Sequence, residues 1–180
     1  MVPANRGRSM SSMADQPASL DNHLPGTVAA INVSGGGVPK SRVSGARVSR
    51  SGLVNDAQDD KKHHGGPERA VCLYSLERIR SLQTEGHPID IGTAGENVTV
   101  EGIDWNQIVP GVTLGIGDEV LLEVASFTNP CKTIRASFIA GEFVRIAHRL
   151  HPGWSRVYAR VLREGQIHFG DPVRVNPGTA

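Results

Sequence analysis

Hydrophobic and polar residues alternate in short runs along this chain, and most runs have the spacing of β-strands. The apolar segment 27–33 ends at Ser34-Gly35-Gly36-Gly37, which is typical of a strand followed by a turn. Successive side chains of a strand point to opposite faces, so apolar residues at every second position predict further strands. The segments with this character are 97–100, 119–126, 155–163, 167–169 and 173–175.

Helical spacing is confined to two parts of the chain. Apolar residues recur at helical intervals between Ser75, a good N-cap residue, and Gly86, which predicts a helix over 76–85. The segment 132–149 suits one or two short helices interrupted near Gly141. Many short strands with few helices predict a mostly β, barrel-like domain that is α+β at its margins.

The polar segments divide the chain. Residues 1–24 are Ser- and Ala-rich without a period, so we expect a disordered leader, followed by one domain over 25–176 and a tail at 177–180. Residues 38–69 are polar and broken by glycine, and we expect little regular structure there. Residues 70–74 fit either a strand or the lead-in to the helix.

Charge and composition narrow the function classes. The net charge is +1, so the chain has no overall positive field that would attract nucleic acid. The stretch 39–50 nevertheless holds basic residues and no acidic one. We interpret that stretch as a solvated loop rather than an anion-facing surface. No apolar run approaches the roughly 18 residues of a membrane span, and the first residues lack a secretory signal. A cytoplasmic location is expected.

The chain has two cysteines, too few for a disulfide scaffold or for the four thiolates of a common iron–sulfur cluster. Cys131 follows Pro130 at the end of a predicted strand. If a helix follows, its N-terminus and Lys132 favour the thiolate, which is both a nucleophile and a soft metal ligand; a half-buried structural cysteine is the alternative. Cys72 has apolar neighbours and is expected to be a small core residue.

Two further features are less specific indications of a binding or catalytic site. His63 and His64 are adjacent, so in an extended chain their side chains point apart, and no third ligand at zinc spacing accompanies them. One of them lining an active-site loop is as plausible as simple solvent exposure. The glycine-rich segment 34–40, which ends in Lys40, has the elements of a loop that presents N–H groups and an ammonium to an anion.

Several segments together resemble the MOSC family, named for the C-terminal domain of molybdenum cofactor sulfurase, and especially its short bacterial YiiM-like branch. The match runs in one order from about residue 27 to 175. The residues that carry it are Val38-Pro39-Lys40, Gly52-Leu53, Asp56, Gln58-Asp59, His64-Gly65-Gly66-Pro67, Gly95-Glu96-Asn97-Val98-Thr99, Gly102-Ile103, Gly115-Ile116-Gly117-Asp118, Pro130-Cys131, Val157-Tyr158-Ala159-Arg160-Val161-Leu162 and Gly165 to Asp171.

The resemblance implies a barrel-like fold in which Cys131 coordinates the molybdenum of a molybdenum–pterin cofactor or carries sulfur. By matching position, the residues expected at the pocket are Asn97, Asn129 and His64. Candidates for holding the pterin phosphate are Lys40, Lys132 and Arg160. The chain departs from some relatives in two segments. Residues 126–129 lack an arginine that is common there, and at 155–157 those relatives carry the aromatic residue earlier in the sequence. Both segments are expected at the rim of the pocket.

Two functions follow from the resemblance. The first is a molybdenum-dependent reductase of N-hydroxylated compounds, such as hydroxylated purine bases, supplied with electrons by an external reductase because no flavin or iron–sulfur motif is visible. The second is a carrier in which Cys131 bears a persulfide and transfers sulfur or cofactor. Some longer relatives use pyridoxal phosphate in a separate domain, and no such partner domain is visible here.

Overall fold

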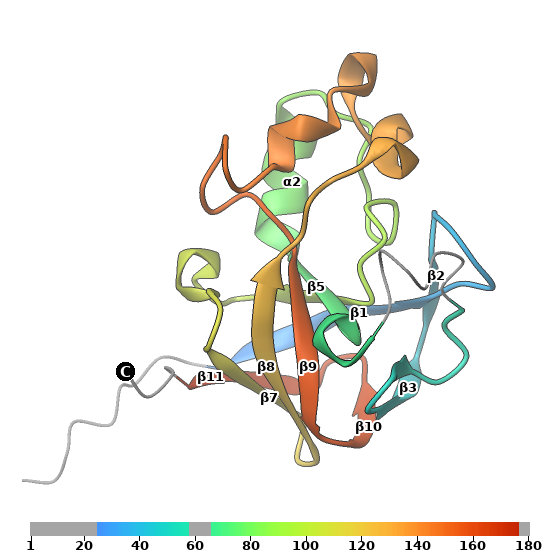
Figure 1. Cartoon of the computed structure of the whole chain (residues 1–180), viewed down its shortest axis with the longest axis vertical. Helices are drawn as coiled ribbons and strands as arrows, with labels where there is room; N and C mark the ends of the chain where they lie inside the picture. The colour runs from blue at the N-terminus through green and yellow to red at the C-terminus, as the bar shows by residue number, and fades with distance from the viewer. Residues whose placement is uncertain (1–24, 58–65, 177–180) are drawn as a thin grey trace, which may run out of the picture.

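The strands form a closed barrel in the computed structural model, which describes residues 25–57 and 66–176 (Figure 1). Hydrogen bonds join seven strands in a ring, in the order β11, β7, β8, β9, β5, β6, β1 and back to β11. β2 extends the sheet beyond β1, while β10, β3 and β4 form a smaller sheet. The strands are β1 Gly26–Val33, β2 Ser41–Val43, β3 Gly45–Ser49, β4 Gly52–Leu53, β5 Val71–Ser75, β6 Val98–Glu101, β7 Thr113–Ile116, β8 Val120–Phe127, β9 Val157–Arg163, β10 Gly165–His168 and β11 Pro172–Asn176.

One pair in the ring, β5 with β6, is parallel, and its connection carries the helix α2, Leu76–Thr84. A parallel pair needs such a crossover, because a short turn cannot bring the chain back to the same end. Ser75 caps the helix by accepting a hydrogen bond from Arg78 N at 3.2 Å, and Leu76, Ile79 and Leu82 are buried. The helix predicted over 76–85 is therefore confirmed.

The barrel-like, mostly β fold class is confirmed as well. Alternate residues of β7, β8 and β9 fill the interior: in β9, for example, Val157, Ala159 and Val161 are buried, while the residues between them are more exposed. β5 is buried along its whole length. The segment 70–74, which the sequence left open, belongs to strand β5. β7 was not among the predicted strands.

Two segments differ from the sequence prediction. Residues 38–69 contain strands β2, β3 and β4, which are so short that the surrounding glycine and serine residues hide their alternation. Residues 132–149 form short helices with a break near Gly141, as predicted, but they are of the 3₁₀ type: η3 Lys132–Ser137, η4 Ile139–Gly141 and η5 Phe143–Ile146. Ala140 and Gly141 have φ values of 52° and 73°, which end any regular helix there.

These 3₁₀ turns lie at the same end of the molecule as α2, at the top of Figure 1. Arg145 in η5 forms a two-bond ion pair with Glu85 just after α2, and Ile139 N donates to His87 Nδ1. The expected leader at 1–24 and tail at 177–180 lie outside the described residues. Among the helices of the described part, none has both the length and the apolar character to cross a bilayer.

Candidate functional site

Both cysteines of the chain line one cavity of about 340 Å³. Its walls come from separate parts of the sequence: the β1–β2 loop, η1 (Pro67–Arg69), β5, the loop before β6, η3 and the start of β9. The lining residues are Gly37, Val38, Lys40, Ala57, Arg69, Cys72, Ala94, Gly95, Asn97, Cys131, Thr133, Ile134, Arg156 and Tyr158.

Cys131 lies half-buried on the cavity wall, four residues beyond the end of β8. The segment leading to it is fixed on the start of β9, because Thr128 N donates to Arg156 O at 3.0 Å and Ser155 Oγ donates to Thr128 O at 3.0 Å. Cys131 precedes η3, a six-residue 3₁₀ helix, rather than the expected α-helix. The stabilisation of a Cys131 thiolate by an α-helix dipole, which the sequence suggested, therefore does not apply.

Cys72 is buried, as the sequence predicted, but it also lines the cavity, which the sequence did not predict. Its position on β5 is opposite Tyr158 on β9, and only 4% of it is exposed. Burial raises the pKa of the Cys72 thiol, and the nearby charge of Arg156 offsets part of that rise. In the protein without metal, this shift favours the protonated thiol of Cys72 over the thiolate.

Lys40 and Asn97, two of the predicted site residues, meet at the cavity wall through Asp56. Lys40 Nζ lies 2.5 Å from Asp56 Oδ2, and Asn97 Nδ2 donates to the same oxygen at 2.7 Å. Asn97 Oδ1 accepts from Cys72 N at 3.1 Å. These contacts tie the β1–β2 loop, β5 and the start of β6 together, and they neutralise the charge of Lys40.

Arg156 and Tyr158 also line the cavity, and sequence reasoning did not select either. The alternation of β9 was the available signal for Tyr158, because Val157 and Ala159 face the core and Tyr158 lies between them. Arg156 directly precedes β9 and is buried, and no local pattern marks it. Burial raises the pKa of Tyr158 to about 12, so its hydroxyl remains a hydrogen-bond donor at neutral pH. The guanidinium of Arg69 lies 5.9 Å from the Tyr158 ring centre.

The other predicted site residues do not line this cavity. Asn129 and Lys132 are exposed to solvent. Arg160 is on β9 but pairs with Glu68 at 3.1 Å and with Glu123 at 2.6 Å, so its charge is already neutralised. His64 lies outside the described residues.

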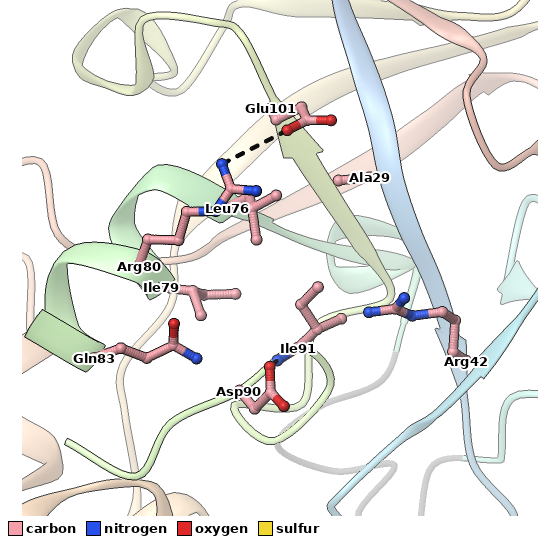
Figure 2. A pocket seen from close by; sticks show the side chains of 9 residues that line it. All are labelled: Ala29, Arg42, Leu76, Ile79, Arg80, Gln83, Asp90, Ile91 and Glu101. Atoms are coloured by element: carbon pink, nitrogen blue, oxygen red, sulfur yellow. Dashed lines mark hydrogen bonds and ion pairs between the residues drawn. The ribbon is translucent and has the colours of Figure 1, made fainter.

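A second hollow of about 370 Å³ lies between α2 and strands β1, β2 and β6 (Figure 2). Charged side chains stand around an apolar floor, and Arg80 pairs with Glu101 at 3.9 Å. Arg42, from the basic stretch at 39–50, reaches this hollow from β2. Neither cysteine lies here, so the residues with distinctive chemistry gather in the first cavity. The lining residues are Ala29, Arg42, Leu76, Ile79, Arg80, Gln83, Asp90, Ile91 and Glu101.

Comparison with solved structures supports the fold. YiiM from Geobacillus stearothermophilus superposes with a TM-score of 0.65 at 24% identity, covering 84% of this chain and 75% of the other. YiiM from Escherichia coli gives 0.63 at 18% identity over 86% and 71% of the two chains. The YUAD protein of Bacillus subtilis gives 0.66 at 15% identity over 87% and 98%.

Relatives are also found by sequence. The protein YflK of Bacillus subtilis is 30% identical over 71% of this chain, and a protein named reductase from Gibberella moniliformis is 30% identical over 69%. YiiM of Escherichia coli is 26% identical over 77%. The chain spans 57%, 22% and 62% of the length of these three relatives, respectively. The MOSC domain model matches residues 60–174, and the chain therefore belongs to the MOSC domain family.

Proposed function

We propose that the first cavity holds a molybdenum–pterin cofactor with Cys131 as metal ligand, and that the protein reduces N-hydroxylated compounds. The observation that carries this proposal is that the half-buried Cys131 lines the same cavity as three cationic residues, Lys40, Arg69 and Arg156. Arg156 is 6% exposed, so its charge is held largely out of water at the cavity wall. Membership of the MOSC family and the relative named reductase support the same class of function.

The residues present fit such a cofactor. A pterin-bound molybdenum is anionic and takes soft sulfur ligands, so its site needs a thiolate together with cationic or N–H donors. Cys131 would ligate the metal. Cys72 is only 4% exposed, so it is less accessible to a metal in the cavity than Cys131. Arg69 and Lys40 would face the anionic groups, although Asp56 already balances Lys40.

When bound, the cofactor would supply two electrons at the metal, and the reduction converts an N–OH group, two electrons and two protons into N–H and water. An electron-donating reductase would supply the electrons from outside the chain. Tyr158 keeps its proton at neutral pH and would donate a hydrogen bond to the N–O oxygen. The Lys40–Asp56–Asn97 contacts would hold the cavity walls in place.

The reaction is tested with protein from a host that makes the cofactor, a chemical electron donor such as reduced methyl viologen, and 6-N-hydroxylaminopurine as substrate. We expect the wild type to form adenine and Cys131→Ala to form none. Cys131→Ala that reduces this compound at the wild-type rate would rule out the function as stated.

The second candidate is a sulfur carrier with a persulfide on Cys131. The observation in its favour is that Cys131 is partly exposed on a cavity wall, where a persulfide has room. Intact-mass measurement distinguishes the two functions. Metal-free protein that carries an extra sulfur at Cys131, removable by a thiol reductant, would favour the carrier over the reductase.

A further inference from the structure

The segment 131–153 starts at Cys131, carries the 3₁₀ turns η3 to η5 and is rich in positive charge. It holds four of the chain's 19 basic residues and one of its 18 acidic residues, so the rest of the chain has fewer basic than acidic residues. The basic residues are Lys132, Arg135, Arg145 and Arg149, and the acidic one is Glu142. A positive field therefore surrounds the turns that follow Cys131.

Three of these cations lack a carboxylate partner. Lys132, Arg135 and Arg149 are exposed, and none of them forms an ion pair within residues 25–57 and 66–176. The fourth, Arg145, is held in the ion pair with Glu85 described above. A partner can therefore bind the three exposed cations without breaking an ion pair of this chain.

Exposed aliphatic side chains lie among the cations. They are Ile139, Val144 and Leu150, which are 49%, 48% and 56% exposed. Arg135 lies against η4, because a Cβ on Gly141 would be 3.4 Å from Arg135 Nε. The basic stretch 39–50, by contrast, exposes no large apolar residue. Arginine together with exposed aliphatic side chains is typical of a protein interface, and we call residues 132–150 the 3₁₀ lobe.

The 3₁₀ lobe also forms part of the cavity wall. Thr133 and Ile134 of η3 line the cavity, while Lys132 and Arg135 on either side of them are exposed. A protein docked on the outside of η3 would therefore be separated from the cavity by a single 3₁₀ helix, which begins directly after Cys131. Electron transfer is fast only over short distances, so this is a suitable place for an electron donor to bind.

We propose that the 3₁₀ lobe is the docking surface for the electron donor, and that the donor is a small electron-transfer protein with an acidic face, such as a flavodoxin. Opposite charges on two surfaces speed their association and orient them. The exposed aliphatic side chains favour a protein over a nucleic acid of the same charge. Each reduced flavodoxin gives up one electron, so two encounters supply the pair that the reduction consumes, and water supplies the protons. The inference rests on the proposed function only in calling the partner a donor.

The test compares two electron donors with the cofactor-loaded protein and 6-N-hydroxylaminopurine. One is the reduced, acidic flavodoxin of the expression host, and the other is reduced methyl viologen, which is too small to need a docking surface. We expect Arg135→Glu/Arg149→Glu to raise the KM for flavodoxin about tenfold at low salt and to leave the rate with methyl viologen unchanged. The control is Arg47→Glu/Arg174→Glu, which changes the net charge equally at exposed positions of β3 and β11, away from the 3₁₀ turns (Figure 1), and should match the wild type.

Two single variants separate the contributions of charge and apolar contact. Ile139→Ser should raise the KM for flavodoxin about threefold without changing the charge. Glu142→Lys removes the one acidic residue of the lobe and should lower that KM. An unchanged KM in Arg135→Glu/Arg149→Glu would overturn the proposal, and so would a rise in KM for Glu142→Lys.

Calorimetric binding of flavodoxin at low salt keeps this proposal distinct from the proposed function. If methyl viologen supports no turnover, but flavodoxin binds and Arg135→Glu/Arg149→Glu weakens that binding about tenfold, the reductase function fails and the docking surface stands. If methyl viologen supports turnover and flavodoxin does not bind the wild type, the docking surface fails and the reductase function stands. Single-stranded RNA that binds more tightly than flavodoxin at the same salt would assign the lobe to nucleic acid and overturn the proposal.

Discussion

Cys72 and Cys131 line the same cavity but differ in solvent exposure. Cys72 is 4% exposed and has a raised pKa, while Cys131 is half-buried. Alkylation requires both access and a thiolate, so the two residues should react at different rates. The difference bears directly on which sulfur can ligate a metal.

We predict that iodoacetamide at pH 8 alkylates Cys131 at least ten times faster than Cys72 in folded, metal-free protein. Peptide mass spectrometry over a time course measures both rates. In guanidinium chloride the two cysteines should react alike, which serves as the control. Faster reaction of Cys72 in the folded protein would contradict the burial described above.

Glu96 is a buried acid whose second oxygen, Oε2, has no hydrogen-bond partner among the described residues. Asn32 Oδ1 is also without a hydrogen-bond partner there. Thr99 Oγ1 contacts both side chains. Because burial raises the pKa of Glu96 above its ordinary 4.5, folding favours the protonated acid. The stability from this group is fully present below about pH 4.5 and is lost as the pH rises towards the raised value.

We predict that Glu96→Gln, which is neutral at every pH, becomes more stable than the wild type as the pH rises from 4 to 8. Each pKa unit of the rise corresponds to about 1.4 kcal/mol, or a few degrees in Tm for a chain of this size. Thermal unfolding across the pH range measures the difference. A difference that does not grow with pH would show that Glu96 is already ionised in the folded protein.

At the scale of elements, the cavity depends on close backbone approaches between loops. Gly92 has φ +81°, and a Cβ there would lie 2.5 Å from Lys40 O. Lys40 N in turn donates to Gly92 O at 3.0 Å. This contact joins the β1–β2 loop, which carries Lys40, to the loop before β6, so a side chain at Gly92 would push the two apart.

We predict that Gly92→Ala lowers the free energy of unfolding by about 2 kcal/mol or more, because it combines left-handed backbone strain with a steric clash. Gly111→Ala is the matched control, since Gly111 has φ +94° but open space around it, and should lose only about 1 kcal/mol. Urea unfolding measures both. Equal losses in the two variants would mean that the contact with Lys40 is not rigid.

Local signals made α2 predictable, because its cap and its apolar spacing lie within ten residues of each other. The 3₁₀ segments were not predictable in this way. Ser137 Oγ donates to Thr93 O and Ile139 N to His87 Nδ1, so contacts with distant residues fix their shape. The place of Cys131 after Pro130 made it a candidate beside a structural cysteine, and the family resemblance selected it. Arg156 was missed because only the folded barrel brings it into the same cavity as a cysteine 25 positions away in the sequence.

At the scale of the whole molecule, the barrel closes at a short seam. β1 and β11 pair at only two positions, Gly26 with Val173 and Thr27 with Pro172. Two further backbone bonds, from Val28 N to Asp171 O and from Gly170 N to Val28 O, extend the contact. Val173 is fully buried at this seam, while Val175 on the same strand is half-buried.

We predict that Val173→Ala costs about 2 kcal/mol of unfolding free energy, the loss of two buried methyl groups plus the cavity they leave. Val175→Ala should cost less than half as much. Denaturant unfolding monitored by tryptophan fluorescence measures both. A larger loss for Val175→Ala would place the closing contact elsewhere than at the seam.

The molybdenum content of the purified protein tests the central claim most directly. Wild type, Cys131→Ala and Cys72→Ser are produced in a host that makes the pterin cofactor, and the metal is quantified by mass spectrometry against protein concentration. The account predicts close to one molybdenum per chain in the wild type and in Cys72→Ser, and almost none in Cys131→Ala. Metal retained by folded Cys131→Ala, or absent from the wild type, would contradict it.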